Sequence, residues 1–337
     1  MERKRVGIYG IGNFGYALLK HLTNQKNYQN IFCFDRNETV RNYLNKKNKH
    51  PFLHKEVKLS KNYIVCSSPK ELIENVQVLI LAINSYAIES ICSYIKNYAQ
   101  KNIVIINTAK ALISPSGITV SNLLNKKLSD KSYKYVMLAG GTIANDLFKH
   151  EPLGISMASS CDDSLDLVYD IFNSKNLKVY KTNDVLGVEF ASAFKNIVSI
   201  LAGIINGFKY SFGSETHIIS TTAGEIKNLC VKYLNAKIET FSIDSQCWGN
   251  DMWMSALGNS RNRKFGLLVA KNNSFKLALN QSNHQNITIE GLETIKCLEK
   301  IINSKSKEFP ILDKIINLSK EKNTKKAVKE LLELYSK

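Results

Sequence analysis

One lysine stands inside the longest apolar stretch of the chain, residues 185–205. Lys195, followed by Asn196, sits near the middle of this predicted helix, where an ammonium group is costly unless it is paired or used. Loss of solvation lowers the pKa of a lysine, so the group can donate and accept a proton near neutral pH. Reduction of a ketone needs such a donor for the alkoxide that forms. Two structural alternatives stay open: the lysine snorkels from the helix edge, or it pairs with Glu189.

A second chemical signal is a G-x-G-x-x-G motif that follows a predicted strand and opens a predicted helix. Its residues are Gly10-Ile11-Gly12-Asn13-Phe14-Gly15. Gly10 allows a tight turn, Gly12 lets a pyrophosphate approach the backbone, and Gly15 lets the helix pack against the strand. The start of the helix offers backbone N–H groups to phosphates. The motif therefore predicts a dinucleotide site, against the alternative of an ordinary glycine-rich turn.

An acidic residue closes the second predicted strand. Asp35 stands 25 residues after Gly10, where a carboxylate usually holds the ribose hydroxyls of NAD. Its charge would repel the 2′-phosphate of NADP, whereas the adjacent Arg36 could pair with that phosphate. Both cofactors remain open, and we favour NAD. The structural alternative is a carboxylate that only stabilises a turn.

A basic loop is the third signal. Residues 258–266 read GNSRNRKFG and hold Arg261 and Arg263, two of only six arginines in the chain. The planar guanidinium fork suits phosphate oxygens. A loop of this kind is often plain surface, but beside a dinucleotide site it favours a small phosphorylated substrate.

The elements that must position these residues differ between the two halves. Residues 5–9, 31–34, 63–66, 76–83, 103–107 and 135–139 are predicted strands. Apolar strands that alternate with helices indicate a doubly wound, Rossmann-type α/β sheet. Residues 184–207, 215–234, 290–302 and 325–335 are predicted helices. The predicted domains are therefore 1–182, which binds NAD(P), and an all-α domain, 183–337, which binds the substrate.

Composition argues against several classes of protein. The 337 residues carry a net charge of +17, but 40 of the 46 basic residues are scattered lysines, which predicts a solvated surface rather than a nucleic-acid site. A nucleic-acid binder without turnover is the alternative, and it would show salt-sensitive binding. The polar residues within 185–205 argue against a membrane span. Seven cysteines without a Cys-x-x-Cys pair, and no signal peptide, predict a cytoplasmic protein without disulfides or a metal site.

These motifs, in this order, resemble the NAD(P)-dependent glycerol-3-phosphate dehydrogenases. The resemblance extends over essentially the whole chain and implies that the protein is a divergent member of that family. Further segments are similar to the family's motifs. They are LILAINSYA at 79–87, NTAKA at 107–111, AGGTIAND at 139–146, the helix 184–207 and SRNRKFG at 260–266.

The resemblance implies reversible reduction of dihydroxyacetone phosphate to sn-glycerol 3-phosphate by a homodimer, in a cleft between the domains at the carboxyl ends of the strands. Lys195 would be the general acid/base, Lys110 would polarise or hold the substrate, and Asp251 would support the lysine. The other implied substrate-binding residues are Asn196, Ser255, Arg261, Asn262 and Thr142. The implied cofactor-binding residues are Gly10, Gly12, Asn13, Phe14, Gly15, Asp35, Arg36, Ala144 and Arg261.

Some positions depart from the family pattern. Asn84 and Gly141 stand where proline is usual, Ala111 where glycine is usual, and Thr222 where arginine is common. The only tryptophans, Trp248 and Trp253, flank Asp251, and they either pack in the core or reshape a pocket. The alternative function is therefore a dehydrogenase of the same fold that acts on another small hydroxy or keto compound.

Overall fold

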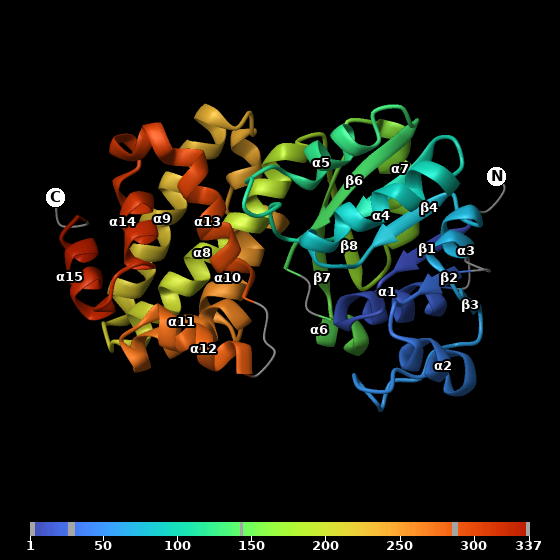
Figure 1. The fold of residues 1–337 in the computed structure, drawn as a ribbon, viewed down its shortest axis with the longest axis horizontal. Helices are drawn as coiled ribbons and strands as arrows, with labels where there is room; N and C mark the ends of the chain where they lie inside the picture. Colours follow the sequence, from blue (N-terminus) through green and yellow to red (C-terminus); the bar gives the residue numbers. More distant parts are fainter. Residues whose placement is uncertain (1–3, 26–30, 142–143, 285–288, 335–337) are drawn as a thin grey trace. The chain divides into compact units, whose positions relative to one another are not determined.

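The computed structural model describes residues 4–25, 31–141, 144–284 and 289–334, and the chain divides into two compact units (Figure 1). Unit 1 comprises Met1–Ala109 and Val120–Val185, and unit 2 comprises Lys110–Thr119 and Leu186–Lys337. The predicted boundary after residue 182 lies three residues from the one between Val185 and Leu186. The difference is Lys110–Thr119, which belongs to unit 2 because it packs there: Ser114 Oγ donates to Glu293 Oε2 at 2.5 Å.

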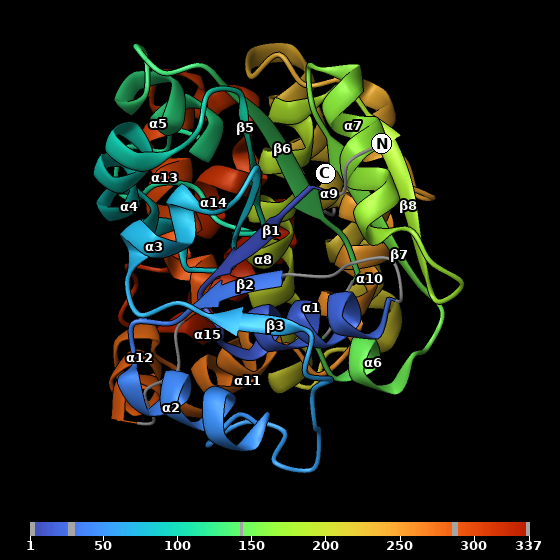
Figure 2. The same ribbon diagram turned by 90° about the vertical axis from the view of Figure 1, so that its right-hand side faces the viewer.

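Unit 1 contains an eight-stranded sheet with the order β3-β2-β1-β4-β5-β6-β7-β8. The strands are β1 (Val6–Tyr9), β2 (Ile31–Phe34), β3 (Tyr63–Val65), β4 (Val78–Leu81), β5 (Ile103–Asn107), β6 (Tyr133–Ala139), β7 (Leu153–Ala158) and β8 (Leu177–Thr182). Figure 2 shows β1, β2 and β3 side by side, and the register pairs Val6 with both Ile31 and Val78. All neighbouring strands are parallel except β6 and β7. The predicted Rossmann-type α/β class is confirmed.

The six predicted strands correspond to β1–β6, whereas β7 and β8 were not predicted. β7 contains Gly154 and Ser156 and lacks the continuous apolar run of a central strand. β8 lies at the edge of the sheet, and its burial alternates residue by residue at its start. Runs of large apolar residues identify strands that are covered on both faces, and these two carry a weaker signal.

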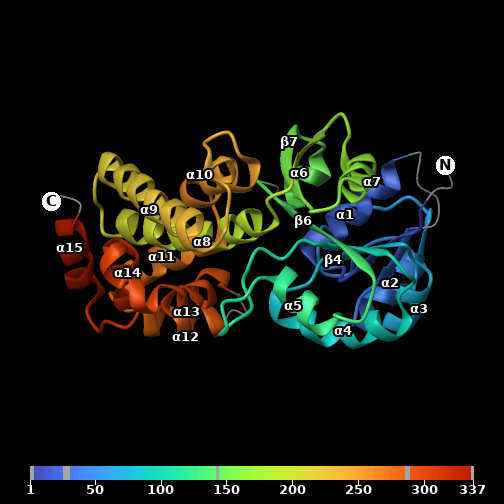
Figure 3. The ribbon, with the colours of Figure 1, turned by 90° about the horizontal axis from the view of Figure 1, so that it is seen from above.

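Helices cover both faces of this sheet (Figure 3). On one face lie α1 (Asn13–Asn24), α6 (Ala144–Lys149) and α7 (Asp162–Phe172), and on the other lie α3 (Pro69–Glu74), α4 (Ser85–Tyr98) and α5 (Val120–Lys127). The helix α2 (Glu38–Lys47) follows β2. Ile8, Leu19, Ile80 and Phe172 belong to one buried apolar cluster. This core holds the end of β1 and the start of α1 in place, and these carry the glycine motif.

Unit 2 is built from helices around a buried central one. The helices are α8 (Val185–Gly207), α9 (Phe212–Tyr233), α10 (Asp251–Leu257), α11 (Arg261–Asn272), α12 (Phe275–His284), α13 (Glu290–Ile302), α14 (Pro310–Leu318) and α15 (Thr324–Leu334). Short helical turns occupy Ile238–Phe241, Gln246–Asn250 and Asn303–Glu308. The four long helices predicted from sequence are confirmed to within three residues. α8 is long and apolar enough to span a membrane, but its most apolar window is entirely buried, as in the core helix of a globular domain.

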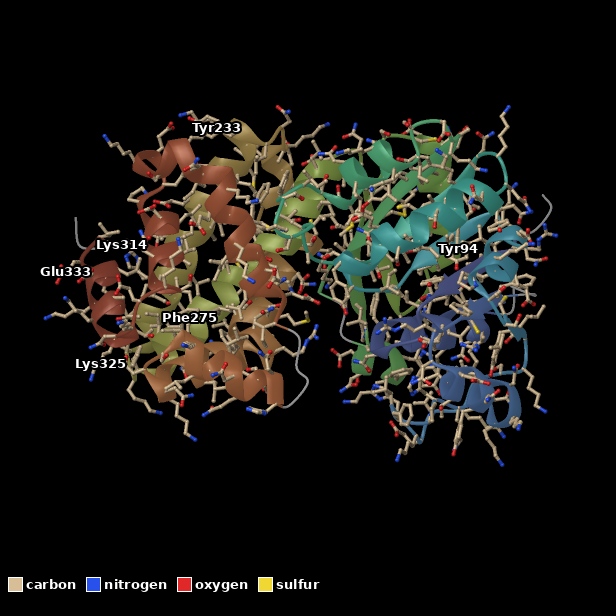
Figure 4. The ribbon with its side chains drawn as sticks, in the orientation of Figure 1. Tyr94, Tyr233, Phe275, Lys314, Lys325 and Glu333 are labelled. Carbon is tan, nitrogen blue, oxygen red and sulfur yellow. The ribbon has the colours of Figure 1, made fainter. Side chains whose placement is uncertain are left out.

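The structure shows the surroundings of the charged side chains and of the cysteines in the described residues. Several surface lysines pair with acids, as Lys314 does with Glu330 at 3.2 Å, and Lys314, Lys325 and Glu333 mark α14 and α15 in Figure 4. None of the seven cysteines, all of which lie in the described ranges, forms a disulfide, and six of them are buried. Within the described part of the chain, no group of three His, Cys, Asp or Glu side chains is placed to hold a metal ion.

Candidate active site

Two lysines converge on one buried aspartate in unit 2. Lys195 Nζ lies 2.8 Å from Asp251 Oδ1, and Lys110 Nζ lies 2.9 Å from Asp251 Oδ2. Ser255 Oγ completes the group, 2.6 Å from Lys195 Nζ and 3.3 Å from Asp251 Oδ1. Lys195 therefore pairs with Asp251 and does not reach out from the helix edge. Four residues singled out from the sequence meet at one point, although they come from three separate segments.

The geometry of α10 explains how Asp251 and Ser255 face the lysine together. They are four residues apart on one helix, so their side chains lie on the same face. The preceding turn, Gln246–Asn250, is π-helical, a form often found at functional sites. Gly249 is required in that turn, because a Cβ there would lie 2.0 Å from the carbonyl oxygen of Ile243.

Burial and charge act against each other in this cluster. Burial lowers the pKa of Lys195, Asp251 raises it, and the nearby Lys110 lowers it further, so that it lies below the ordinary lysine value. For Asp251, burial alone would raise the pKa, but the two ammonium groups outweigh it and hold the pKa below the ordinary range. The cluster thus holds an ionised carboxylate beside a lysine that gives up its proton more readily than a free one.

Lys110 reaches this cluster because the chain turns directly after β5. The Asn107 side chain is fully buried, and its Oδ1 accepts a hydrogen bond from Ala109 N at 3.0 Å. The following residues, Lys110–Thr119, pack within unit 2, where Cys297 Sγ approaches the carbonyl oxygen of Ile113 at 3.9 Å. The chain is thus held in place by one contact just before Lys110 and another just after it.

A chain of amide groups links Lys110 to the basic loop. Asn196 Nδ2 donates to the carbonyl oxygen of Lys110 at 3.1 Å, and Asn196 Oδ1 accepts from Asn262 Nδ2 at 2.9 Å. Asn262 Oδ1 accepts from Gly291 N at 3.0 Å. The contact between Asn196 and Asn262 requires α8 and α11 to lie close together. Gly266 permits this approach, because a Cβ at that position would lie 2.1 Å from the carbonyl oxygen of Ile200. Sequence analysis identified both asparagines but not their contact.

Arg261 opens α11 from the loop side. Ser260 caps the helix by accepting from Arg263 N at 3.1 Å. Arg261 and Asn262 are the first two residues of the helix, and their backbone N–H groups belong to its first turn. Arg261 is 58% exposed, and its Nη2 lies 3.1 Å from Glu290 Oε1 at the start of α13. Sequence analysis gave no role to Glu290, because nothing in the order of residues shows that α13 begins beside α11.

The glycine motif of unit 1 has the geometry expected of each glycine. Gly10 has φ +95°, which other residues rarely adopt, and a Cβ on Gly15 would lie 2.0 Å from the carbonyl oxygen of Gly10. Around Gly12 a Cβ would meet no described atom within 4 Å, so the backbone is open there. This open cradle at the N-terminus of α1 fits a dinucleotide pyrophosphate.

Asp35 braces the same loop. Its Oδ2 accepts from Ile11 N and its Oδ1 from Asn37 N, both at 2.8 Å. The carboxylate therefore does stabilise a turn, and it stays beside the glycine motif. Arg36 is exposed, whereas Arg41, which sequence analysis did not single out, donates from Nη1 to the carbonyl oxygens of Asp35 and Arg36.

The remaining predicted cofactor residues lie at helix starts in unit 1. Asn13 begins α1, and its Oδ1 lies 2.7 Å from His54 Nε2, a contact that sequence analysis missed. Phe14 packs on the core, and Ala144 is buried at the start of α6. The predicted substrate residue Thr142 lies outside the described residues.

The residues that depart from the family pattern differ in their burial and contacts. Trp248 is buried against Phe241, with ring centroids 5.0 Å apart, whereas Trp253 is 48% exposed. Asn84 precedes α4, and its Nδ2 donates to Tyr86 Oη at 3.0 Å. Thr222 is fully buried. Core packing therefore accounts for one of the two tryptophans.

Comparison with known proteins extends over most of the chain. Residues 5–165 match the model for the NAD-dependent glycerol-3-phosphate dehydrogenase N-terminus, and residues 184–330 match the model for the C-terminus of the same family. A glycerol-3-phosphate dehydrogenase [NAD(P)+] from Clostridium perfringens is 26% identical, over 92% of this chain and 91% of its own.

Two solved structures have the same fold. Glycerol-3-phosphate dehydrogenase from Coxiella burnetii superposes with a TM-score of 0.87 at 20% identity, covering 98% of this chain and 99% of the other. The Plasmodium falciparum enzyme gives 0.87 at 21% identity, with 97% and 94% covered. The two family models and the shared architecture agree, and the chain belongs to the NAD-dependent glycerol-3-phosphate dehydrogenase family.

Proposed function

We propose that this chain carries out the reaction of its family, reversible reduction of dihydroxyacetone phosphate to sn-glycerol 3-phosphate with NAD(P)H, and that Lys195 is the proton donor. The buried group of Lys195, Asp251 and Lys110 is the observation that carries this proposal. A carbonyl oxygen that gains negative charge during reduction is stabilised by preorganised positive groups. Two ammonium groups and one carboxylate leave this group with one net positive charge.

Lys195 protonates the substrate oxygen in this mechanism. Its ammonium has three N–H groups, and among the described residues Asp251 and Ser255 accept two of them. The third is available to the substrate oxygen. Asp251 holds the ammonium in one orientation, and the reduced pKa of Lys195 eases proton transfer in both directions of the reaction.

The basic loop binds the phosphate of the substrate. Arg261 presents an exposed guanidinium fork, and Asn262 lies beside it in the first turn of α11, where backbone N–H groups favour anions. Lys110 supplies a second cation close to the reacting carbon. Asn196 connects the two sites by hydrogen bonds to both Lys110 and Asn262.

The glycine motif binds the cofactor, which supplies the hydride when it is bound. Gly12 leaves room for the pyrophosphate, and Asn13 and Phe14 begin the helix that offers N–H groups to it. We infer a preference for NAD, because hydrogen bonds from Ile11 N and Asn37 N hold the Asp35 carboxylate in place, where it opposes a 2′-phosphate. The exposed Arg36 would favour NADP. The cofactor preference therefore depends on the balance between the negative charge of Asp35 and the positive charge of Arg36.

The setting of the enzyme is a further part of this proposal. The family resemblance favours a homodimer, and seven cysteines that form no disulfide with one another accord with the reducing cytoplasm. The sequence-based division into a cofactor-binding domain, 1–182, and a substrate-binding domain, 183–337, stands as a proposal, with Lys110–Thr119 as the segment of the first domain that serves the second.

Oxidation of NADH and NADPH with dihydroxyacetone phosphate tests substrate class and cofactor choice together. We expect turnover with both cofactors and a higher kcat/KM with NADH. A panel of phosphorylated and unphosphorylated keto compounds serves as the comparison. Faster turnover of another ketone would reject the proposed substrate, and salt-sensitive nucleic-acid binding without any turnover would reject the enzyme.

A further inference from the structure

We propose that Arg263 is a positioning residue that fixes the loop between the proton-transfer group and the phosphate-binding residues. Arg263 is the second arginine of the basic loop, but its side chain is only 13% exposed. Its Nη1 lies 2.5 Å from Glu215 Oε1 and also donates to the carbonyl oxygen of Ala256. The first arginine, Arg261, is 58% exposed. Two positions apart on a helix, the two side chains point in different directions.

Glu215 is built to receive this arginine. It lies in the first turn of α9 and is 1% exposed. Its second oxygen, Oε2, accepts from Asn206 Nδ2 at 3.0 Å, near the end of α8. Both carboxylate oxygens therefore have partners, as a buried charge requires. Through Asn206, Glu215, Arg263 and Ala256, four helices are joined at one point: α8, α9, α11 and α10.

The loop that this group holds connects the two functional parts of the site. α10 ends at Leu257 and α11 begins at Arg261, so only three residues separate them. Arg263 binds the carbonyl oxygen of Ala256, directly after Ser255, and Ser260 Oγ donates to the carbonyl oxygen of Ser255 at 2.6 Å. Both contacts tie the first turn of α11 to the last turn of α10.

This arrangement sets the distance between the pair of residues that orients the proton donor and the pair that binds the phosphate. Asp251 and Ser255 orient Lys195 from α10, while Arg261 and Asn262 bind phosphate from α11. The substrate has its carbonyl and its phosphate at a fixed separation, and displacements of about 1 Å can reduce turnover by up to about a hundredfold. A buried ion pair is weak evidence for stability, and here its geometry serves alignment.

The inference rests on the proposed roles of Arg261 and Lys195, and variants at positions 215 and 263 test it. Arg263→Ala should raise KM for dihydroxyacetone phosphate about tenfold and lower kcat less. Added guanidinium ion at millimolar concentration should restore part of the loss. Glu215→Ala should behave like Arg263→Ala. Glu215→Gln is the milder variant, since its amide oxygen still accepts from Arg263 but the charge that balances the buried guanidinium is lost. Its KM should lie between that of wild type and that of Glu215→Ala, and a KM equal to that of wild type in both Glu215 variants overturns the inference.

A purely structural role would lower Tm without changing KM. If Arg263→Ala is folded, as far-UV circular dichroism would show, and keeps the wild-type KM, the inference is overturned. If that variant does not fold, Arg263→Lys decides the question: it keeps the cation but loses the fork, so KM should rise about threefold, and an unchanged KM overturns the inference.

Arg261→Ala separates this inference from the proposed function. A large rise in KM in Arg261→Ala, with no change in any folded Arg263 variant, leaves the proposed function in place and rejects the positioning role. An unchanged KM in Arg261→Ala rejects the proposed phosphate site itself. NADH affinity, measured by fluorescence titration, should change less than about twofold in the Arg263 variants, because the glycine motif belongs to unit 1.

Discussion

The glycine motif of unit 1 and the lysine cluster of unit 2, formed by Lys110, Lys195, Asp251 and Ser255, are suited to charged ligands for opposite reasons. At Gly10–Gly15 the glycines lack side chains, so the ligand has room to approach the backbone N–H groups. Around Asp251 the site is made of charged side chains that are buried and paired. The first arrangement depends on one turn and the second on three distant segments, so substitutions should affect them differently.

The largest effect is expected in the lysine cluster. Lys195→Ala should lower kcat for dihydroxyacetone phosphate reduction about a thousandfold, because the proton donor is lost. The Kd for NADH should remain within about twofold of wild type, since the glycine motif lies in the other unit. Lys181→Ala is a matched control, because that lysine is partly exposed and pairs with the exposed Asp166 at 2.5 Å. Wild-type turnover in Lys195→Ala would end the assignment of the cluster.

Asp251→Asn should have the next largest effect, about a hundredfold in kcat. Asp251 raises the pKa of Lys195, so its loss lowers that pKa further. Reduction needs the protonated lysine, and the alkaline limb of its pH–rate profile should therefore move to lower pH. A limb that stays in place would show that the profile does not report Lys195.

The same variant predicts a change in stability at low pH. The pKa of Asp251 is lower in the folded chain than the unfolded value of about 3.9, so ionisation favours folding above that value. The contribution is lost as pH falls through the folded pKa. Unfolding in urea between about pH 2 and 5 should show a weaker pH dependence in Asp251→Asn than in wild type.

In unit 1 the effects should be smaller and should separate folding from binding. Gly12→Ala adds a methyl group to open space, so Tm should be nearly unchanged while KM for NADH rises about tenfold. Gly15→Ala places a methyl group 2.0 Å from the carbonyl oxygen of Gly10, so both Tm and NADH affinity should fall. Equal thermal destabilisation by the two substitutions would contradict this distinction.

Asp35→Asn should produce the smallest change. The amide oxygen keeps one backbone hydrogen bond to the loop, while the charge that opposes a 2′-phosphate is lost. The ratio of kcat/KM for NADPH to that for NADH should rise about fivefold, with Arg36→Ala as the opposing variant. If Asp35→Asn weakens both cofactors equally, the carboxylate serves only the turn that it makes with Ile11 and Asn37.

Much of unit 1 was predictable because its signals are local. The strands 31–34 and 103–107 agree with β2 and β5, and the glycine motif lies between a strand and a helix as its spacing requires. β7 and β8 were missed because a strand with small residues, and a strand at the sheet edge, lack a continuous apolar run. The roles of the glycines follow from backbone geometry, which the sequence expresses directly.

The sequence by itself determined the residue types of the site and the helices that carry them. It marked Lys195 as a charge inside an apolar helix, and the family resemblance added Lys110, Asp251, Ser255 and Asn262. Only the tertiary structure decided their partners, since Lys110 and Asp251 are 141 residues apart and meet at 2.9 Å. It also gave the two arginines of one loop different surroundings, one exposed and one buried on Glu215. Local sequence fixes backbone conformation and helix faces, but contacts between distant side chains depend on how whole helices pack.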